Sequence, residues 1–246
     1  MTNQDRESTN LKTARIVGLL ILTATVAYMT GSGFVDAILT APDYLLHVHP
    51  DRIQLIIGVL IQFVGAAANV SIGVVLFPIL KKYSQTVAIG YVATRIFDGA
   101  GLLIAGIGTL SLIVLSQEMI QAGTQGAASV LILGNLIVAG SSTTFLVTMM
   151  ALGLGSLPLC YLLYRTRLIP RSMAALGFIG YVALLMGSAV ELFGFNLNMM
   201  HFLPGGIFEL ILPLWLIVKG FSPSAIASQS TRTDATTREQ MSLSHV

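Results

Sequence analysis

The stretch Gly90-Tyr-Val-Ala-Thr-Arg95-Ile-Phe-Asp98-Gly-Ala-Gly101 places an arginine and an aspartate inside a long apolar segment. The surrounding apolar run is long enough to cross a lipid bilayer as a helix. A charged side chain at that depth costs on the order of 3 kcal/mol or more, so it needs a partner within the protein. The stretch therefore predicts a membrane-spanning helix that carries a buried ion pair.

The composition of the whole chain agrees with a membrane location. Of its 246 residues, 54% are hydrophobic and only 10% are charged, whereas about a quarter of the residues in a soluble domain are charged. So few charged side chains cannot cover a soluble fold, and we predict that lipid is the main solvent. No basic face exists outside the short loops, which argues against nucleic acid as a partner.

The apolar segments predict an all-α, polytopic membrane protein with about six transmembrane helices. The expected spans, within a transmembrane domain of residues 14–221, are about 16–38, 53–80, 86–115, 141–164, 172–195 and 203–219. The apolar stretch 129–140 is too short to span, so we expect an interfacial or re-entrant helix, or else a part of the fourth span. Residues 1–13 are polar, and residues 222–246 are predicted to form a disordered tail.

Stripes of small and polar residues predict which helix faces pack against protein. In the second span the stripe consists of Gly58, Gln62, Gly65, Asn69 and Gly73. In the fourth span it consists of Thr144, Thr148, Ala151, Gly155 and Pro158. Steps of three and four place such residues on one helix face, where small side chains let backbones approach closely in lipid. We therefore expect both faces to contact neighbouring helices.

The distribution of Lys and Arg predicts the orientation. With six spans both chain ends lie on one side, and most of the 13 Lys and Arg residues gather there: Arg6, Lys12, Arg15, Lys81, Lys82, Arg165, Arg167, Arg171, Lys219, Arg232 and Arg238. Only Arg52 lies on the other side, and Arg95 lies inside the third span. Because Lys and Arg accumulate in cytoplasmic loops, both termini are predicted to be cytoplasmic, in the plasma (inner) membrane.

Four polar residues are expected to form a buried cluster, namely Asn69, Arg95, Asp98 and Glu209. At about 1.5 Å per residue, Arg95 and Glu209 lie about 13 and 15 Å from the cytoplasmic ends of their spans, and the other two lie at about 18 Å. One arginine facing two acids leaves a net negative charge, which a proton or a bound cation would neutralise. Alternatively, the set is a structural ion pair that locks the third and sixth helices together.

A second polar set is predicted near the outer side, consisting of Asp36, His47, His49, Glu191 and His201. Two histidines at His47 and His49, with carboxylates nearby, could hold a metal, but the spacing is not diagnostic and a polar interfacial loop is the favoured interpretation. We therefore predict no metal and no cofactor. The sequence also contains no His-Glu-x-x-His, Gly-x-Ser-x-Gly or phosphate-loop motif, so no enzyme activity is expected.

A faint internal echo links two parts of the chain. Pro78, a basic loop and Gly90-Tyr-Val-Ala93 are paralleled by Pro158, a basic loop and Gly180-Tyr-Val-Ala183. Parallel repeats of this kind occur in transporter folds. Apolar, glycine-rich segments also match by chance, and we favour that interpretation.

Several stretches resemble the bacterial membrane proteins grouped as domain of unknown function DUF4386. They are Ala14-Arg-Ile-Val-Gly-Leu-Leu20, the Arg95-centred third helix, residues 155–180 with Tyr-Arg-Thr-Arg-Leu-Ile-Pro-Arg at 164–171, and Phe208-Glu-Leu-Ile-Leu-Pro-Leu-Trp-Leu-Ile-Val-Lys-Gly220. The resemblance implies a six-helix membrane protein whose intramembrane arginine and last-helix glutamate correspond to Arg95 and Glu209. It also implies an acidic residue where this chain has Asn69, and it supplies a fold but no reaction.

Three functional hypotheses follow. The first is small-solute or ion-coupled transport or binding, in which the cluster faces a cavity open to one side. The second is a structural, sensory or assembly protein that transports nothing, in which the cluster is closed and every polar atom is paired. The third, an intramembrane enzyme, is least favoured because the sequence offers no nucleophile or metal set. The lipid bilayer is the one partner that the sequence predicts.

Overall fold

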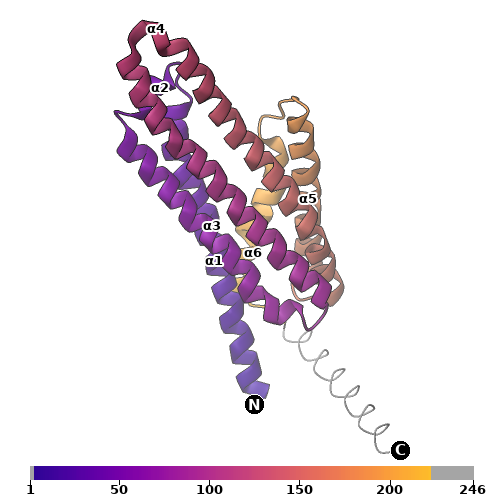
Figure 1. The fold of residues 1–246 in the computed structure, drawn as a ribbon. Helices are drawn as coiled ribbons and strands as arrows, with labels where there is room; N and C mark the ends of the chain where they lie inside the picture. The colour runs from indigo at the N-terminus through magenta and orange to yellow at the C-terminus, as the bar shows by residue number, and fades with distance from the viewer. Residues whose placement is uncertain (1–2, 223–246) are drawn as a thin grey trace, which may run out of the picture.

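The computed structural model describes residues 3–222 and is helical almost throughout (Figure 1). Its elements are α1 (Asn3–Leu39), α2 (Tyr44–Val48), α3 (Arg52–Leu80), α4 (Gln85–Thr166), α5 (Arg171–Leu192), the 3-10 helix η1 (Met200–Phe202) and α6 (Leu203–Val218). Six stretches of this range are long and apolar enough to cross a membrane: Asn10–Leu39, Arg52–Leu80, Gln85–Gln121, Ala127–Thr166, Arg171–Leu192 and Met200–Val218. The all-α, six-helix prediction is confirmed, and the chain is a multi-pass membrane protein. The predicted disordered tail lies, beyond Ser222, outside the described residues.

The long helix α4 supplies two of these spans because it folds back on itself (Figure 1). We call Gln85–Gln121 its first leg and Ala127–Thr166 its second leg. The legs touch at Thr94 and Gly155, at Gly101 and Thr148, and at Gly108 and Ser141. The two members of each pair are equally far in sequence from a point between residues 124 and 125. The legs therefore run antiparallel in one constant register, and Thr148 and Gly155 of the predicted stripe face the first leg, whereas Pro158 is exposed.

The structure decides between the alternatives left open for residues 129–140. This stretch is part of the fourth span, rather than an interfacial or re-entrant helix, because it belongs to the second leg of α4 without a break. The first leg also continues past its predicted end at 115, through Gln117, Glu118 and Met119. These residue types favour helix, so the connection between the two legs is only a turn, which leaves room for two full spans.

The small-residue stripe of α3 packs against α1 in its first half and against α4 in its second half. A Cβ atom added to Gly58 would lie 2.9 Å from the carbonyl oxygen of Gly31 on α1. A Cβ atom added to Gly73 would lie 3.1 Å from the Cβ atom of Arg95 on α4. Both helices therefore approach the α3 backbone closely, as the stripe predicted.

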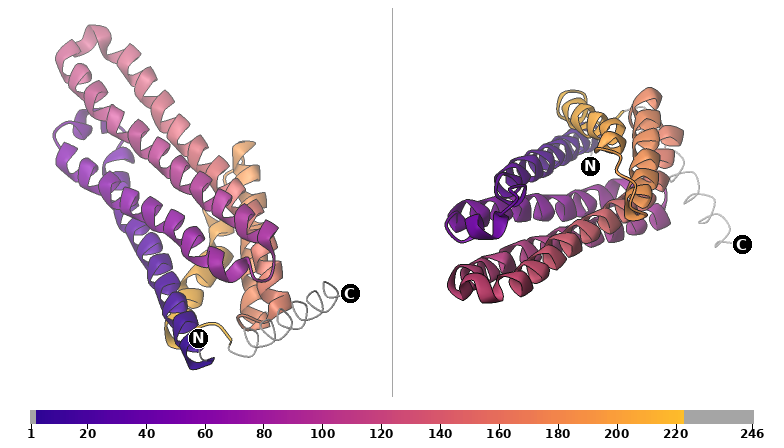
Figure 2. Two further views of the ribbon diagram at one scale, coloured as in Figure 1. Left: turned by 60° about the horizontal axis from the view of Figure 1, so that its bottom comes forward. Right: turned by 90° about the horizontal axis from the view of Figure 1, so that it is seen from above.

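The apolar core has two parts, and the charged residues lie between them. Along α4 the first part includes Tyr91 and the second includes Leu112. Arg95 and Asp98 fall between these two positions in the chain and are themselves buried. Figure 2 shows α5 and α6 together on one side of the bundle, where α5 packs on α4 and α6 packs on α1. The buried charges thus lie inside a ring of helices.

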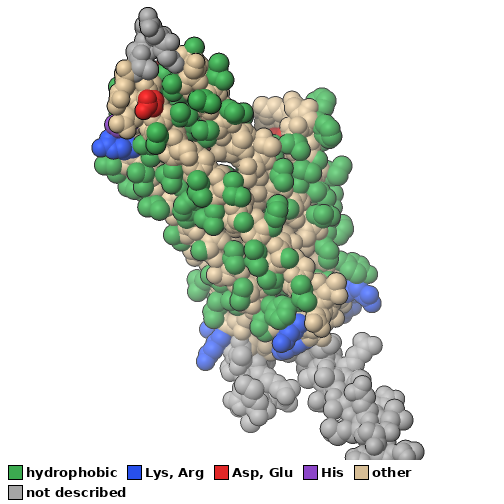
Figure 3. All heavy atoms as spheres, viewed as in Figure 1, with side chains coloured by type: hydrophobic (Ala, Val, Ile, Leu, Met, Phe, Trp, Pro, Cys, Tyr) green, Lys and Arg blue, Asp and Glu red, His purple; other side chains and the backbone are tan. Residues whose placement is uncertain are grey.

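The surface has an apolar body and one strongly basic end (Figure 3). The helix order places the loop 81–84, the loop 167–170 and the described ends of the chain at the same end, which we call the basic end. Figure 3 shows hydrophobic side chains over the body and Lys and Arg side chains at this end. α2 and the tip of α4 lie at the other end, which we call the opposite end (Figure 1).

Candidate functional site

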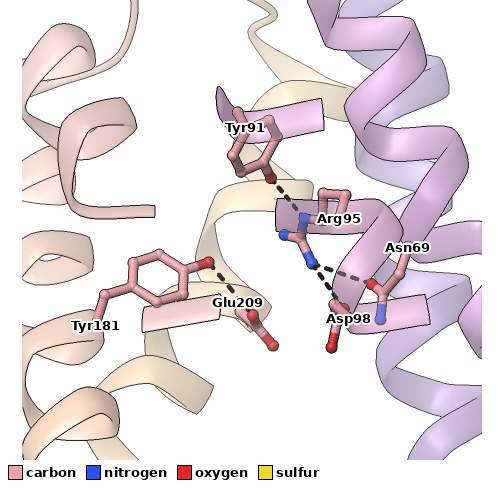
Figure 4. A network of polar contacts seen from close by, with 6 residues as sticks. All are labelled: Asn69, Tyr91, Arg95, Asp98, Tyr181 and Glu209. Atoms are coloured by element: carbon pink, nitrogen blue, oxygen red, sulfur yellow. Dashed lines mark hydrogen bonds and ion pairs between the residues drawn. The ribbon is translucent and has the colours of Figure 1, made fainter. Parts of the chain in front are cut away.

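Arg95, on the first leg of α4, is the centre of a buried polar group. Its side chain is only 5% exposed. Its Nε donates a hydrogen bond to the Tyr91 hydroxyl at 2.8 Å, and its Nη1 donates to Asn69 Oδ1 on α3 at 3.1 Å (Figure 4). Nη1 also lies 3.7 Å from Asp98 Oδ2. The guanidinium group therefore has two hydrogen bonds and one ion pair, and its bond to Asn69 links α3 to α4.

Asp98, one turn further along the same leg, is poorly satisfied. Its side chain is fully buried, at 0% exposure. Within the described part of the chain, neither carboxylate oxygen has a hydrogen-bond partner. The distance of 3.7 Å to Arg95 Nη1 is too long for a hydrogen bond. A buried carboxylate without hydrogen-bond donors is costly in free energy. Asp98 is therefore the group that a bound proton or cation would stabilise most.

Glu209, on α6, belongs to a second pair across the bundle. The Tyr181 hydroxyl of α5 donates to Glu209 Oε1 over a long 3.4 Å. Figure 4 shows this pair facing the Arg95 group without a direct bond to it. The structure thus brings Asn69, Arg95 and Asp98 into contact and places Glu209 opposite them, tied to a tyrosine.

A small cavity lies between the Arg95–Tyr91 pair and the Glu209–Tyr181 pair. Arg95, Tyr91, Tyr181 and Glu209 line it, and its volume is about 30 Å³, which is room for about one or two water molecules. The rest of its wall consists of apolar side chains from α1, α3, α4 and α6, together with Ile169 and Phe221. These residues lie between the cluster and the basic end.

Three aromatic rings lie on the other side of the cluster. Tyr28 on α1 stacks on Phe145 of the second leg, with ring centres 5.6 Å apart and planes 5° apart. Phe145 in turn lies 5.9 Å from the ring of Phe202 on η1. Tyr28 lies beyond Ile21, the last α1 residue that lines the cavity, in the direction of the opposite end. Rings from three separate elements therefore meet on that side.

The predicted outer-side residues are spread over separate places. Asp36 is exposed on α1. His47 Nε2 lies 3.3 Å from Asp43 Oδ1, and both side chains are exposed. The backbone N–H of His49 donates to Ser116 Oγ at 2.8 Å. Among the residues that the structure describes, no three His, Cys, Asp or Glu side chains come together to hold a metal ion.

Glu191 and His201 form a pair of their own near the opposite end. His201 Nδ1 lies 3.7 Å from Glu191 Oε1, with side chains 4% and 19% exposed. The same carboxylate oxygen accepts a hydrogen bond from the backbone N–H of Leu197 at 3.3 Å. Neither ring nitrogen of His201 has a hydrogen-bond partner in the described range. The pair joins η1 to α5 and is separate from the Arg95 group.

Sequence reasoning missed the role of the two tyrosines. Tyr91 binds Arg95, and Tyr181 binds Glu209, so each charged residue that lines the cavity has a tyrosine partner. The signal was present in the echo of Gly-Tyr-Val-Ala at 90–93 and 180–183. Tyr91 and Tyr181 hold the same place in these two matching stretches, and both contact a charged residue that lines the cavity.

A comparison with family models gives a match over most of the chain. The model described as "Domain of unknown function (DUF4386)" covers residues 16–220. The chain belongs to the DUF4386 family. No curated protein and no solved structure matches it.

In this DUF4386 protein, the two residues that the resemblance singled out line one cavity. Arg95 and Glu209 approach it from α4 and α6. Asn69, where an acidic residue was implied, accepts a hydrogen bond from Arg95 but brings no charge. The negative charges facing Arg95 in this chain therefore come from Asp98 and Glu209.

Proposed function

We propose that this DUF4386 protein binds a proton or a small monovalent cation at the cluster of Asn69, Arg95, Asp98 and Glu209, and that this binding serves ion-coupled transport or ion sensing across the membrane. The observation that carries the proposal is Asp98, a fully buried carboxylate whose two oxygens have no hydrogen-bond donor among the described residues. Its partner Arg95, 3.7 Å away, lines a cavity together with a second acid, Glu209.

The charges of the cluster support this proposal. Arg95 supplies one positive charge, whereas Asp98 and Glu209, when ionised, supply two negative charges. An unbalanced charge inside a lipid-surrounded bundle is costly. One proton, or one monovalent cation, would bring the cluster to neutrality, so the cluster has a chemical reason to take up either.

The size of the cavity restricts the ligand. About 30 Å³ accommodates one or two water molecules or a small ion, but an organic solute needs a pocket of about 300 Å³ or more. In the conformation described, this cavity therefore suits a proton, carried by water, or a monovalent cation. A small solute would require the helices to separate.

The access route and the orientation belong to the same proposal. The residues that line the cavity lie between the cluster and the basic end, and the Tyr28, Phe145 and Phe202 rings lie on the other side of the cluster. By the positive-inside rule the basic end faces the cytoplasm, with the chain in the plasma (inner) membrane. The ion would then enter from the cytoplasmic side in this conformation. We propose no catalytic activity, because the sequence contains no catalytic motif.

One observation favours a second candidate, a structural role. Arg95 donates hydrogen bonds to Tyr91 on its own helix and to Asn69 on α3, and it pairs with Asp98 at 3.7 Å. A buried arginine held in this way locks two helices together without any ligand. Under this alternative Asp98 completes the lock, and the protein serves assembly or sensing.

Melting curves of the purified protein in detergent distinguish the two candidates. The parent, Asp98→Asn and Glu209→Gln are compared between pH 5 and 9 in choline chloride, and again with LiCl, NaCl or KCl at equal ionic strength. Asp36→Asn is the control, because it removes an exposed acid from α1. We expect the parent and the control to share a pH-dependent or cation-dependent melting temperature, and both cluster variants to lose it.

The structural candidate predicts a different pattern. The cluster variants would melt at lower temperature but keep the pH and cation profile of the parent, and this result would reject ion binding. Vesicles that contain a pH-sensitive dye then test transport. Under an imposed potential, proton or cation flux should appear with the parent and with Asp36→Asn and should be absent with Glu209→Gln.

A further inference from the structure

The connection between α4 and α5 has an anchored backbone and outward-facing charge. Leu168 and Ile169 are only 0% and 2% exposed, so they fix the turn in the core. Around them Arg165, Arg167 and Arg171 are exposed. We call residues 165–171 the arginine loop. The two buried side chains anchor its backbone to the core, and its three guanidinium groups are exposed on the surface.

Two exposed tyrosines hold two of these arginines in place. The guanidinium carbon of Arg165 lies 5.9 Å from the ring centre of Tyr161, and that of Arg171 lies 5.2 Å from the ring centre of Tyr164. Both are within cation–π range. A guanidinium that rests on a ring keeps its N–H donors free at its edge, and no ion pair within the described part of the chain uses them. The loop therefore presents guanidinium N–H donors that the tyrosine rings have already positioned.

Arg167 adds a third charge at an unfavourable backbone position. It ends α4 with a φ of 55°, in the left-handed region. Glycine is the usual residue at such a helix end because it has no Cβ atom. An arginine here gives the loop a positive charge where the backbone alone would favour glycine.

From residue 10 onward, the charge around the loop is of one sign. The described segments 10–15, 81–85, 164–172 and 218–222, all at the basic end, contain basic residues and no acidic residue. Tyr161 and Tyr164 are 56% and 42% exposed at the neighbouring end of the second leg, where lipid surrounds the helix. An anion bound here would therefore have a cationic loop on one side and a lipid-facing aromatic surface on the other.

We propose that the arginine loop binds the phosphate group of an anionic phospholipid such as phosphatidylglycerol. Guanidinium groups match phosphate with paired hydrogen bonds, which lysines cannot reproduce. The exposed tyrosines favour a lipid over free phosphate, since they offer an apolar surface to the acyl chains directly below the headgroup. The site is distinct from the buried cluster and does not depend on the proposed ion binding.

Native mass spectrometry of the full chain, titrated with phosphatidylglycerol or phosphatidylcholine in mixed micelles, tests this proposal. The test variant is Arg165→Gln/Arg171→Gln, and the control is Lys81→Gln/Lys219→Gln, which removes the same charge from the same end. We expect the test variant to bind phosphatidylglycerol with about a tenth to a thirtieth of the parent affinity, which corresponds to the loss of two arginine contacts. The control should bind within about threefold of the parent.

A third variant, Arg165→Lys/Arg171→Lys, keeps the charge and removes the forked donors. We expect it to bind several-fold more weakly than the parent. Equal losses in the glutamine test and control variants would show diffuse electrostatic attraction and overturn the site. Equal binding of phosphatidylcholine and phosphatidylglycerol by the parent would overturn it without any variant. Full displacement of phosphatidylglycerol by millimolar inorganic phosphate, at constant ionic strength, would identify free phosphate as the ligand instead.

Discussion

The antiparallel register of α4 can be tested at Gly101. A Cβ atom added there would lie 2.0 Å from Thr148 Oγ1 and 3.1 Å from its Cβ atom. Thr148 is 1% exposed and its hydroxyl donates to the Thr144 carbonyl at 2.7 Å, so it has little freedom to move. Overpacking of this kind costs about 1–3 kcal/mol. Replacing a helical glycine by alanine returns about 0.5–1 kcal/mol.

Gly90 on the same leg provides the matched control, because a Cβ atom added to it meets nothing within 4 Å. Gly90→Ala should gain only the stability that comes from the higher helix propensity of alanine. The two alanine variants should therefore differ in free energy of unfolding by about 1–3 kcal/mol. The measurement is reversible unfolding in mixed detergent micelles. Thr148→Ala should largely rescue Gly101→Ala, because only the 3.1 Å contact then remains. Equal stability of Gly101→Ala and Gly90→Ala, or strict additivity of the double variant, would refute the register.

Other predictions concern the cluster and the opposite end. Arg95→Gln should lower the free energy of unfolding by about 3–5 kcal/mol, because it leaves Asp98 buried without a cation, and adding Asp98→Asn should recover part of the loss in the same unfolding assay. Tyr44→Phe should cost about 1 kcal/mol, since the Tyr44 hydroxyl bonds to Asn135 Oδ1 at 3.0 Å. Burial raises the pKa of Tyr44 above its ordinary value of 10.0. The stabilising effect of the neutral Tyr44 hydroxyl should therefore be complete below pH 10 and decline above it. Melting curves from pH 8 to 11 should show a smaller decline in melting temperature for Tyr44→Phe than for the parent.

The membrane fold could be predicted because its causes are local. Apolar length, small-residue stripes and the placement of Lys and Arg each act within one helix or loop, so they are visible in sequence. The sequence left residues 129–140 undecided because the start of the fourth span depends on a turn within α4. The helix formers at 117–119 extend the first leg, so the sequence signal for the turn is confined to Gly123 and Gly126.

The cluster was predicted only in part, for a physical reason. Asn69, Arg95 and Asp98 lie on two neighbouring helices, and depth counting alone brought them together. The position of Glu209 relative to Arg95 depends on how α5 and α6 pack, which no local pattern records. Tyr181 was missed because tyrosines in apolar helices are common, and its role follows only from a partner 28 residues away in the chain.

The hairpin of α4 limits how the chain can change length during evolution. One residue added or lost within either leg would rotate everything beyond it by about 100°, and the touching pairs such as Thr94 and Gly155 would no longer face each other. A change near residues 122–126 would leave every pair in place. We therefore expect insertions and deletions among homologous chains to concentrate at this tip, or to occur in both legs at once. The same tip is the position at which a reporter domain could be inserted with the least disturbance of the buried charges.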